Sequence, residues 1–493
     1  MTISATDTAT AGLSKTGLSK EEVFAALEDK RKDDVPWRTG RAFAYVYDGG
    51  REVEEVAKKA FNAFMTENGL DPTAFPSLLR FENDLVAIAR AHLGGGPEVV
   101  GSFTSGGTES ILLAVKTARD WARKTRGMTD VEIIVPSSAH AAFHKAGAYL
   151  GVKVVTTPID PVTMRADVAA MKAAINERTA LLVASASGYA HGVVDPVREI
   201  AGLAKERGIL CHVDGCIGGF VLPYFKRFGA EIPDFDFTVP GVTSMSIDLH
   251  KYALTPKGAS VVLYANDELR RHQFFACASW TGYTMVNPTV QSTKSGGPLA
   301  AAWAVMHYLG DAGYENVMRA LYDAKEAIVR GIGEIPGLRV MGSPEMTLVA
   351  FTSDEVAVFP IADEMKKRGW LIQPQLAFGG SKENLHVTIQ PSNVPHVAAL
   401  LSDLRDSVEA VRKKGAPDGD AVAMARALAE RLSGPDGEAM LPGLLDAMGI
   451  GSNGTVPGEM ADVNALMNLL PRDVQERLLV HDVARLFTPK AAS

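Results

Sequence analysis

The spacing of hydrophobic and polar positions changes along the chain, and the changes predict its organisation. Apolar side chains recur at helical spacing over residues 51–68, and a second helical pattern covers 78–94 and ends at Gly-Gly-Gly-Pro. From about 99 to 310, short β-branched runs alternate with helical segments; the runs cover 132–135, 152–156, 180–184, 209–213, 242–247 and 260–264. Strands that alternate with helices predict right-handed crossovers and a mostly parallel sheet.

A second, smaller alternation follows two predicted helices at 297–310 and about 313–333. Its predicted strands lie near 338–341, 347–352 and 384–390, and its predicted helices near 359–369 and 393–413. Beyond 415, two Gly/Pro-rich breaks separate helical pieces. The predicted regions are a disordered leader (1–19), an N-terminal helical segment (20–98), a large sheet domain (99–310) and a small C-terminal α/β domain with a helical tail (311–493).

Charge and composition narrow the class of protein. The 493 residues contain 50 Lys and Arg against 58 Asp and Glu, a net charge of −8, so neither nucleic acid nor an anionic membrane surface is an expected partner. No apolar run reaches the roughly 18 residues of a membrane span. The N-terminus lacks the apolar core of a signal peptide. The 46 Gly and 26 Pro, without low-complexity repeats, favour many tight connections, as in a wound α/β enzyme.

Three cysteines, Cys211, Cys216 and Cys277, are too few for a disulfide framework and suit a reducing compartment. We therefore expect a cytoplasmic protein. Cys211, His212 and Cys216 are close enough in sequence to raise the question of a metal site. No second Cys/His pair at ligand spacing accompanies them, so core positions are the favoured interpretation and no metal is expected.

Two strand ends carry the clearest chemistry. Lys251 follows an apolar run in SMSIDLHKY, and a fixed, partly desolvated lysine amine can serve as a Schiff-base nucleophile. An isolated lysine is more often a solvated surface group. Asp214 lies just beyond the 209–213 run in HVDGCIGGF, where parallel sheets bind ligands. A buried carboxylate with a Schiff-base lysine is what pyridoxal phosphate (PLP) requires, whereas a helix cap or turn is the structural alternative for Asp214.

The segment TSGGTES (104–110) opens an amphipathic helix. Free backbone N–H groups, hydroxyls and two glycines there favour a phosphate cradle, although Gly and Thr before a helix are by themselves only a capping signal. The segment matches neither GxxxxGK[ST] nor GxGxxG, which disfavours a nucleotide P-loop or a dinucleotide fingerprint.

Three histidines are further candidates for function. His140 and His144 are one helical turn apart in PSSAHAAFHKAG, but the HExxH pattern of a zinc site is absent. Stacking on a cofactor ring is the functional interpretation for His140, and a structural role is favoured for His144. His191 follows the 180–184 run and lies at the same predicted ligand edge.

In order, TSGGTES, SSAHAAFHKA, HGVVDP, HVDGCIGGF, GVTSMSIDLHKY and PKGASVVLY resemble the motifs of the sphingosine-1-phosphate lyases. These enzymes are fold-type-I PLP-dependent proteins, beside the group II amino-acid decarboxylases. The resemblance, from about residue 40 to 410, implies a fold-type-I transferase-like α/β fold. In the expected fold, a mostly parallel large-domain sheet is flanked by helices, and a smaller C-terminal α/β domain follows. The resemblance also implies PLP as cofactor, a phosphorylated amino-alcohol lipid as substrate and a homodimer with shared active sites.

By motif match, the resemblance implies cofactor-binding residues. Lys251 would carry the cofactor as a Schiff base, Asp214 would pair with the pyridine nitrogen, and His140 would stack on the ring. Residues expected at the cofactor phosphate are Gly106, Gly107 and Thr108, with His250 nearby.

The resemblance implies a second group of residues on the substrate side. Ser185 and His191 would border the cofactor O3′ and the substrate. Lys257 in TPKG would face the substrate, and Tyr47 would reach the substrate phosphate across a dimer interface. The loop that contains Gly297 would reach the partner's site.

The substrate half of the motif set departs from the family pattern. Asp71 stands where a His is usual, and Lys294-Ser295-Gly296-Gly297 replaces an Arg-Pro-Gly-Gly element. The segment 187–190 lacks the usual proline. The expected reaction is retro-aldol cleavage of a phosphorylated sphingoid base to a long-chain aldehyde and phosphoethanolamine. The alternatives are a group II amino-acid decarboxylase, which uses the same cofactor residues, and a catalytically silent protein, which would have lost Lys251 or Asp214.

Overall fold

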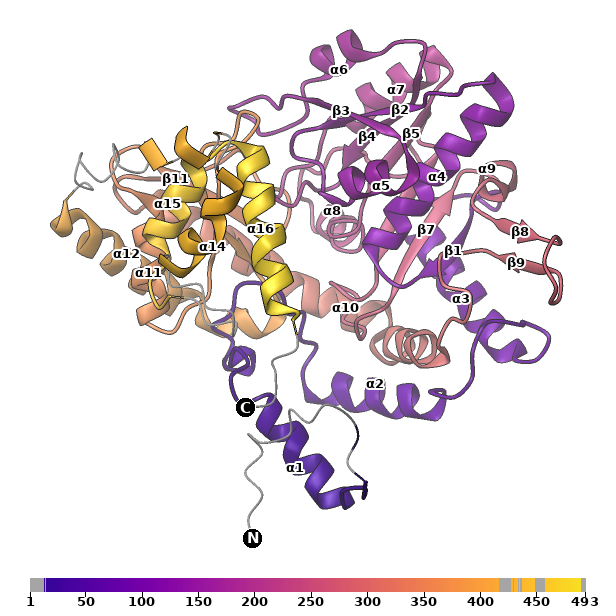
Figure 1. Ribbon diagram of the computed structural model, residues 1–493, viewed down its shortest axis with the longest axis horizontal. Coiled ribbons are helices and arrows are strands. Elements are labelled where there is room, and N and C mark those ends of the chain that lie inside the picture. The colour runs from indigo at the N-terminus through magenta and orange to yellow at the C-terminus, as the bar shows by residue number, and fades with distance from the viewer. Residues whose placement is uncertain are drawn as a thin grey trace.

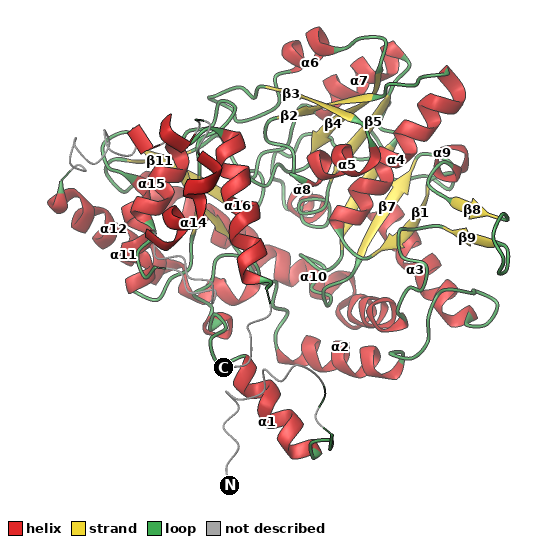
Figure 2. Ribbon diagram, viewed as in Figure 1, coloured by secondary structure: helices red, strands yellow, loops and turns green. Residues whose placement is uncertain are grey.

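The computed structural model describes residues 13, 15–415, 427–428, 430–432, 434, 437–447 and 457–488. Two α/β bodies lie side by side, with α10 (Gly296–Gly333) running beneath both (Figures 1 and 2). The N-terminal α1 (Lys20–Lys30) projects from them and buries none of its residues. The leader predicted over 1–19 lies largely outside the described residues. No described helix is both long and apolar enough to cross a membrane.

The larger body is built on a seven-stranded sheet. In spatial order its strands are β1 (Val100–Thr104), β7 (Ser260–Tyr264), β6 (Ser244–Asp248), β5 (Leu210–Asp214), β4 (Thr179–Ser185), β2 (Glu132–Pro136) and β3 (Lys153–Thr157). β7 runs antiparallel to both of its neighbours, and the other pairs are parallel. The predicted mostly parallel sheet is confirmed. β1 was missed, because it pairs with a strand more than 150 residues away along the chain.

Helices cover both faces of this sheet. In β2, Ile134 packs into the core on one face, whereas Ile133 and Val135 pack into the core on the other. Strands buried on both faces have no polar alternation. The helices of this body are η2 (Trp37–Thr39), α2 (Arg51–Ala63), α3 (Pro76–His92), α4 (Gly107–Arg126), α5 (Ala142–Leu150), α6 (Val168–Ala174), α7 (Val197–Arg207), α8 (Leu222–Arg227) and α9 (Asp267–Arg271). A short hairpin, β8 (Phe275–Cys277) and β9 (Met285–Asn287), follows α9.

The smaller body is a four-stranded antiparallel sheet covered by helices. Its strand order is β10 (Leu338–Val340), β11 (Leu348–Ser353), β13 (Asn384–Thr388) and β12 (Gln373–Gln375). Its helices are α11 (Val358–Lys367), η3 (Pro391–His396) and α12 (Val397–Lys414). Gly310, at φ 58° and ψ 179°, interrupts α10, which agrees with the two helices expected on either side of it. The domain division at 310 stays a prediction.

Three C-terminal helices follow, α14 (Gly437–Ala447), α15 (Ala461–Leu469) and α16 (Arg472–Leu486) (Figure 1). α15 packs against α11, and α14 packs against α16. They have an apolar cluster of their own, whose buried members are Leu432, Leu441, Leu470, Val474 and Leu478. The predicted helical tail is therefore an ordered unit over its described residues.

Candidate active site

The carboxyl ends of the central strands form one edge, and the predicted site residues start from it. Ser185 at the end of β4 is opposite Asp214 at the end of β5. Because β7 is antiparallel, its first residue, Ser260, is opposite both Asp248 of β6 and Thr104 of β1. The segments that follow β1, β4, β5 and β6 thus begin side by side, at the edge where open α/β sheets bind ligands.

Asp214 closes β5 with its carboxylate held in one orientation. Its Oδ1 accepts a hydrogen bond from the backbone N–H of Cys216 at 3.0 Å and another from the Ser246 hydroxyl at 3.3 Å. The residue is 7% exposed. A buried carboxylate fixed in this way can face a cationic group of a ligand.

Lys251 lies in the turn after β6, where its Nζ is 2.9 Å from Asp248 Oδ2. Burial alone would lower the pKa of Lys251, but the Asp248 carboxylate, with a smaller contribution from Asp214, raises it overall. Sequence reasoning assigned no role to Asp248. The available signal was its position three residues before Lys251 in IDLHK.

His250 stands between the phosphate-cradle segment and Asp248. Its Nδ1 accepts from the backbone N–H of Ala259 at 3.2 Å, so the neutral ring carries its proton on Nε2, 3.5 Å from Asp248 Oδ2. Burial lowers the pKa of His250 to about 4, against the opposing effect of Asp248. A Cβ on Gly106 would lie 3.3 Å from the His250 ring, so the two predicted neighbours are in contact.

The predicted phosphate cradle forms the N-terminus of α4. A Cβ on Gly107 would lie 2.8 Å from both Asp248 Oδ2 and Cys216 Sγ, so only glycine lets this backbone approach the lysine turn. Thr108, in the first turn, is exposed. The free N–H groups of a 20-residue helix favour an anion here.

Lys257 and Tyr47 meet within one chain. Lys257 Nζ lies 4.7 Å from the centroid of the Tyr47 ring, which makes an edge contact with Tyr252. Burial and the charge of Lys251 lower the pKa of Lys257. Tyr47 also lines a cavity of about 320 Å³ with Leu254 and other residues of the N-terminal segment. The structure thus brings a second cation close to Lys251.

Ser185 and His191 are both buried at this edge. Among the described residues, Ser185 Oγ and His191 Nδ1 have no hydrogen-bond partner. His191 Nε2 lies 2.9 Å from Ser381 Oγ, and burial lowers the pKa of His191 to about 4. Ser381 was missed, because it belongs to the connection between β12 and β13 and no local pattern marks it.

The structure also places His140, His144 and Gly297. His140 is exposed just before α5, and its Nδ1 accepts from the Ala142 N–H at 3.1 Å. His144 is exposed on the same helix. Gly297 is buried in the first turn of α10, where a Cβ would lie 3.0 Å from the Phe61 ring.

The departures from the family motifs have structural partners of their own. Asp71 Oδ1 caps a turn by accepting from the N–H and hydroxyl of Thr73, at 2.8 and 2.7 Å. Lys294 is buried, and its Nζ lies 2.7 Å from Glu82 Oε2 and 3.1 Å from the Phe103 carbonyl. Both residues therefore serve the fold of this chain.

Cys211, His212 and Cys216 are core residues, as expected. The ring nitrogens of His212 lie 2.9 Å from Ser244 Oγ and 3.3 Å from Ser246 Oγ, so the histidine is satisfied by hydroxyls.

Comparison with known proteins now decides the family. Residues 37–354 match the model of the pyridoxal-dependent decarboxylase conserved domain. The sphingosine-1-phosphate lyase of Arabidopsis thaliana is 41% identical over 404 residues, which cover 80% of this chain and 73% of the relative. The sphingosine-1-phosphate lyase of Oryza sativa is 42% identical over 409 residues, which cover 81% of this chain and 75% of the relative. The chain belongs to the sphingosine-1-phosphate lyase family.

Solved structures agree with this lyase-family assignment. The sphingosine-1-phosphate lyase of Burkholderia pseudomallei K96243 superimposes with a TM-score of 0.79 at 34% identity, over 82% of this chain and 94% of that one. The glutamate decarboxylase of Lactobacillus brevis has a TM-score of 0.71 at 17% identity, over 82% and 95%, and so shares the fold. The predicted fold class is confirmed. Residues 419–485 match a C-terminal putative HTH domain of pyridoxal-dependent enzymes, which the sequence analysis did not identify.

The cofactor of this lyase-family protein is PLP, and the residues present fit it. Lys251 offers a half-buried amine, Asp214 a buried and oriented carboxylate, and α4 an N-terminus that approaches the lysine turn. Ser185 Oγ and His191 Nδ1 are buried polar atoms without partners among the described residues. Buried polar atoms without partners are few in folded proteins, and a functional role is one of their explanations.

Proposed function

We propose that this chain cleaves phosphorylated sphingoid bases to a long-chain aldehyde and phosphoethanolamine. The observation that carries the proposal is the pair of Lys257 and Tyr47, 4.7 Å apart beside Lys251. A second cation in this position suits a substrate phosphate, which an amino-acid decarboxylase has no need to bind. The relatives at 41% and 42% identity, which bear the lyase name, support the same substrate class.

The cofactor would be held by residues of the sheet edge. Lys251 Nζ would bind its aldehyde carbon, Asp214 would face its ring nitrogen and His140 would stack on the ring. The phosphate would be bound at the start of α4 by Gly106, Gly107 and Thr108, with His250 beside them, and Ser185 Oγ would donate to the ring oxygen. When bound, PLP supplies an electron-poor ring that stabilises negative charge on the neighbouring substrate carbon.

Cleavage breaks the bond between the carbon that bears the amine and the carbon that bears the hydroxyl. A base takes the hydroxyl proton, the hydroxyl-bearing carbon becomes the aldehyde, and the other carbon takes up a proton. Lys251, Lys257 and His191 are the candidates for these transfers. Burial lowers the pKa of His191 to about 4 and also lowers the pKa of Lys257, so both groups are unprotonated more often at pH 7 than a solvated lysine is.

Product analysis tests the function. The full chain, loaded with PLP, is given sphinganine 1-phosphate and, separately, a panel of aromatic and acidic amino acids. We expect aldehyde and phosphoethanolamine from the lipid, and loss of most turnover but not of cofactor binding in Lys257→Ala. Lys153→Ala, an exposed lysine at the far edge of the sheet, is the matched control. Carbon dioxide release from an amino acid, without aldehyde from the lipid, would establish the decarboxylase alternative instead.

We also propose a homodimer with shared active sites, located in the cytoplasm. The β8–β9 hairpin exposes Phe275, Trp280, Tyr283 and Val286, apolar area that a second copy would cover. Residues near Gly297 would then reach the partner's site. Three free cysteines support a reducing compartment. Light scattering is expected to give twice the chain mass, and an active, monodisperse monomer would contradict the dimer.

A further inference from the structure

We propose that α15 and α16 position two histidine-bearing loops of the active site by holding the turn at residues 377–381, with Asn468 and Arg472 as positioning residues. The inference rests on the proposed function, since it concerns the loops that carry His140 and His191. The C-terminal unit would thus help to position active-site residues.

The charge of this unit disfavours nucleic acid as its partner. Residues 419–485 contain five Arg or Lys and ten Asp or Glu, a net charge of −5. Helix-turn-helix units that bind DNA present a basic surface, because phosphate contacts supply most of their affinity. Within the chain, the unit contacts α11 and the turn at residues 377–381.

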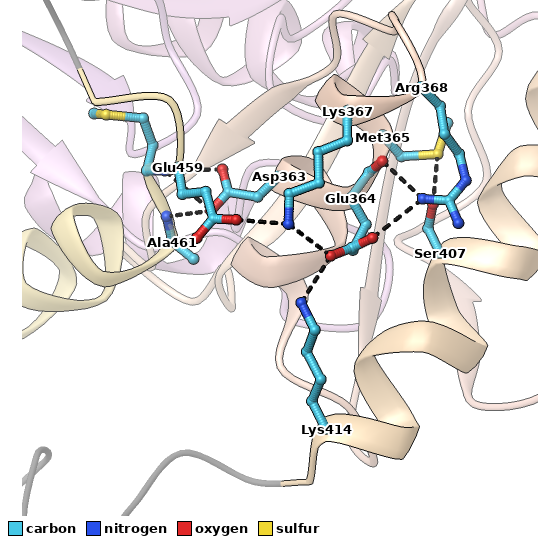
Figure 3. Close-up of polar contacts among 10 residues, drawn as sticks. Asp363, Glu364, Met365, Lys367, Arg368, Ser407, Lys414, Glu459 and Ala461 are labelled. Atoms are coloured by element: carbon cyan, nitrogen blue, oxygen red, sulfur yellow. Dashed lines mark hydrogen bonds and ion pairs between the residues drawn. The ribbon is translucent and has the colours of Figure 1, made fainter.

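The unit docks on α11 through charged groups (Figure 3). The Asp363 carboxylate accepts the backbone N–H groups of Met460 and Ala461, each at 2.8 Å, and so caps the start of α15. Lys367 joins Glu459 at 2.5 Å to Glu364 at 3.0 Å. These contacts place α15 and α16 on the small body in one orientation.

From this position the tail binds the turn. The backbone N–H of Ala377 donates to Asn468 Oδ1 at 2.7 Å, and the Ala377 carbonyl accepts from the Arg472 guanidinium. The guanidinium also lies 5.2 Å from the centroid of the Phe378 ring. Both backbone polar groups of Ala377 are thus satisfied by the tail.

The turn itself is tightly built. Phe378 and Ser381 exchange two backbone hydrogen bonds of 2.9 Å. Gly379 at φ 54° and Gly380 at φ 100° occupy conformations that other residues rarely adopt. A displacement at one end of so short a closed turn is therefore passed to the other end.

The far side of the turn contacts both histidine loops. The Gly379 carbonyl accepts from Ser137 Oγ at 2.9 Å, three residues before His140. Ser381 Oγ lies 2.9 Å from His191 Nε2. The turn at residues 377–381 therefore connects the tail to the loop after β2 and to the loop after β4, and the Ser381 contact fixes which way the His191 ring faces.

Hydrogen exchange and steady-state kinetics on the full chain test the coupling. In Asn468→Ala and Arg472→Ala, we expect faster amide exchange in peptides covering 137–141 and 186–193, already in the apoprotein. In the PLP-loaded enzyme, kcat should fall by roughly ten- to a hundredfold with KM little changed, because misplacement affects chemistry more than substrate affinity. Arg472→Lys, which keeps a donor for the Ala377 carbonyl, should recover part of the loss.

Arg485→Ala is the matched control, because this arginine of α16 pairs with Asp446 inside the tail at 2.7 Å and does not contact the turn. It should leave loop exchange and kcat unchanged. In a Ser381→Ala background, Arg472→Ala should lose most of its effect on kcat. Unchanged exchange in both loops, or an equal effect of Arg485→Ala, would overturn the proposal. Faster loop exchange in a protein without lyase activity would instead refute the proposed function and leave the coupling standing.

Discussion

Lys251 Nζ lies 2.9 Å from Oδ2 of Asp248, so the candidate cofactor lysine is paired with a carboxylate only three residues earlier in the chain. Asp248 ends β6 and is 2% exposed. Burial would raise the pKa of Asp248, but the charge of Lys251, together with hydrogen bonds from Lys251 and Ser260, lowers it overall. The pair holds the amine at the sheet edge, between Asp214 and the start of α4.

Asp248→Asn should weaken both the position and the charge of Lys251. The pKa of Lys251 should fall, because the carboxylate that raises it is lost. The free energy of unfolding of the apoprotein should drop by roughly 1–3 kcal/mol, since a half-buried ammonium loses its partner. Amine labelling against pH, followed by mass spectrometry, and chemical denaturation measure the two effects. Asp354→Asn, which removes an exposed pair with Lys382, is the control and should change little. A labelling profile of Lys251 identical to that of the native chain would refute the assignment.

Lys251→Ala should abolish covalent attachment of the cofactor. Borohydride reduction of the loaded native protein is expected to leave a mass adduct on the peptide that contains Lys251, and the variant should show none. Turnover should fall by at least roughly a thousandfold. Lys257→Ala is the comparison, since it should keep the adduct. An adduct on Lys257 in the native protein would show instead that Lys257 binds the cofactor, and would contradict the assignment of Lys251.

The buried neutral His191 predicts a loss of stability in mild acid. An unfolded histidine titrates near pH 6.5, whereas the folded pKa of His191 is about 4. As the pH falls, the unfolded chain therefore binds a proton first, so the free energy of unfolding decreases between about pH 6.5 and 4. Below about pH 4 both states are protonated, and the contribution of His191 no longer changes with pH. Between pH 7 and 5 it amounts to roughly 2 kcal/mol. Urea midpoints of the apoprotein should show a smaller pH dependence in His191→Asn and an unchanged one in the exposed control His144→Asn.

Gly107→Ala should impair cofactor binding. The added Cβ would lie 2.8 Å from Asp248 Oδ2 and from Cys216 Sγ, so the start of α4 must shift. Overpacking of this kind costs about 1–3 kcal/mol of free energy. If that cost weakens cofactor binding, the affinity for PLP should fall roughly ten- to a hundredfold. Gly202→Ala is the control, because no atom lies within 4 Å of its added Cβ in α7. Equal PLP dissociation constants for both variants would argue against a phosphate cradle at Gly107.

The strands and their ends were predictable because they depend on neighbouring residues. The apolar run predicted at 209–213 is β5 (Leu210–Asp214), and the run at 260–264 is β7. The antiparallel direction of β7 and its place between β1 and β6 were not predictable, because pairing depends on segments far apart in the chain. The left-handed break at Gly310 lies where a glycine separated two helical patterns.

By itself the sequence determined the α/β class, the cofactor and most residues at the carboxyl edge, since strand periodicity and short motifs are local properties that survive without a fold. Only the tertiary structure decided the pairing of Lys251 with Asp248, the meeting of Lys257 with Tyr47, and the contact of Ser381 with His191. The position of Asp248, three residues before Lys251, could be read from the sequence. Its contact with Lys251 could not, because the direction of a side chain depends on the conformation of the folded backbone. Ser381 could not be found, because 190 residues separate it from His191 and only packing of the small body brings them together.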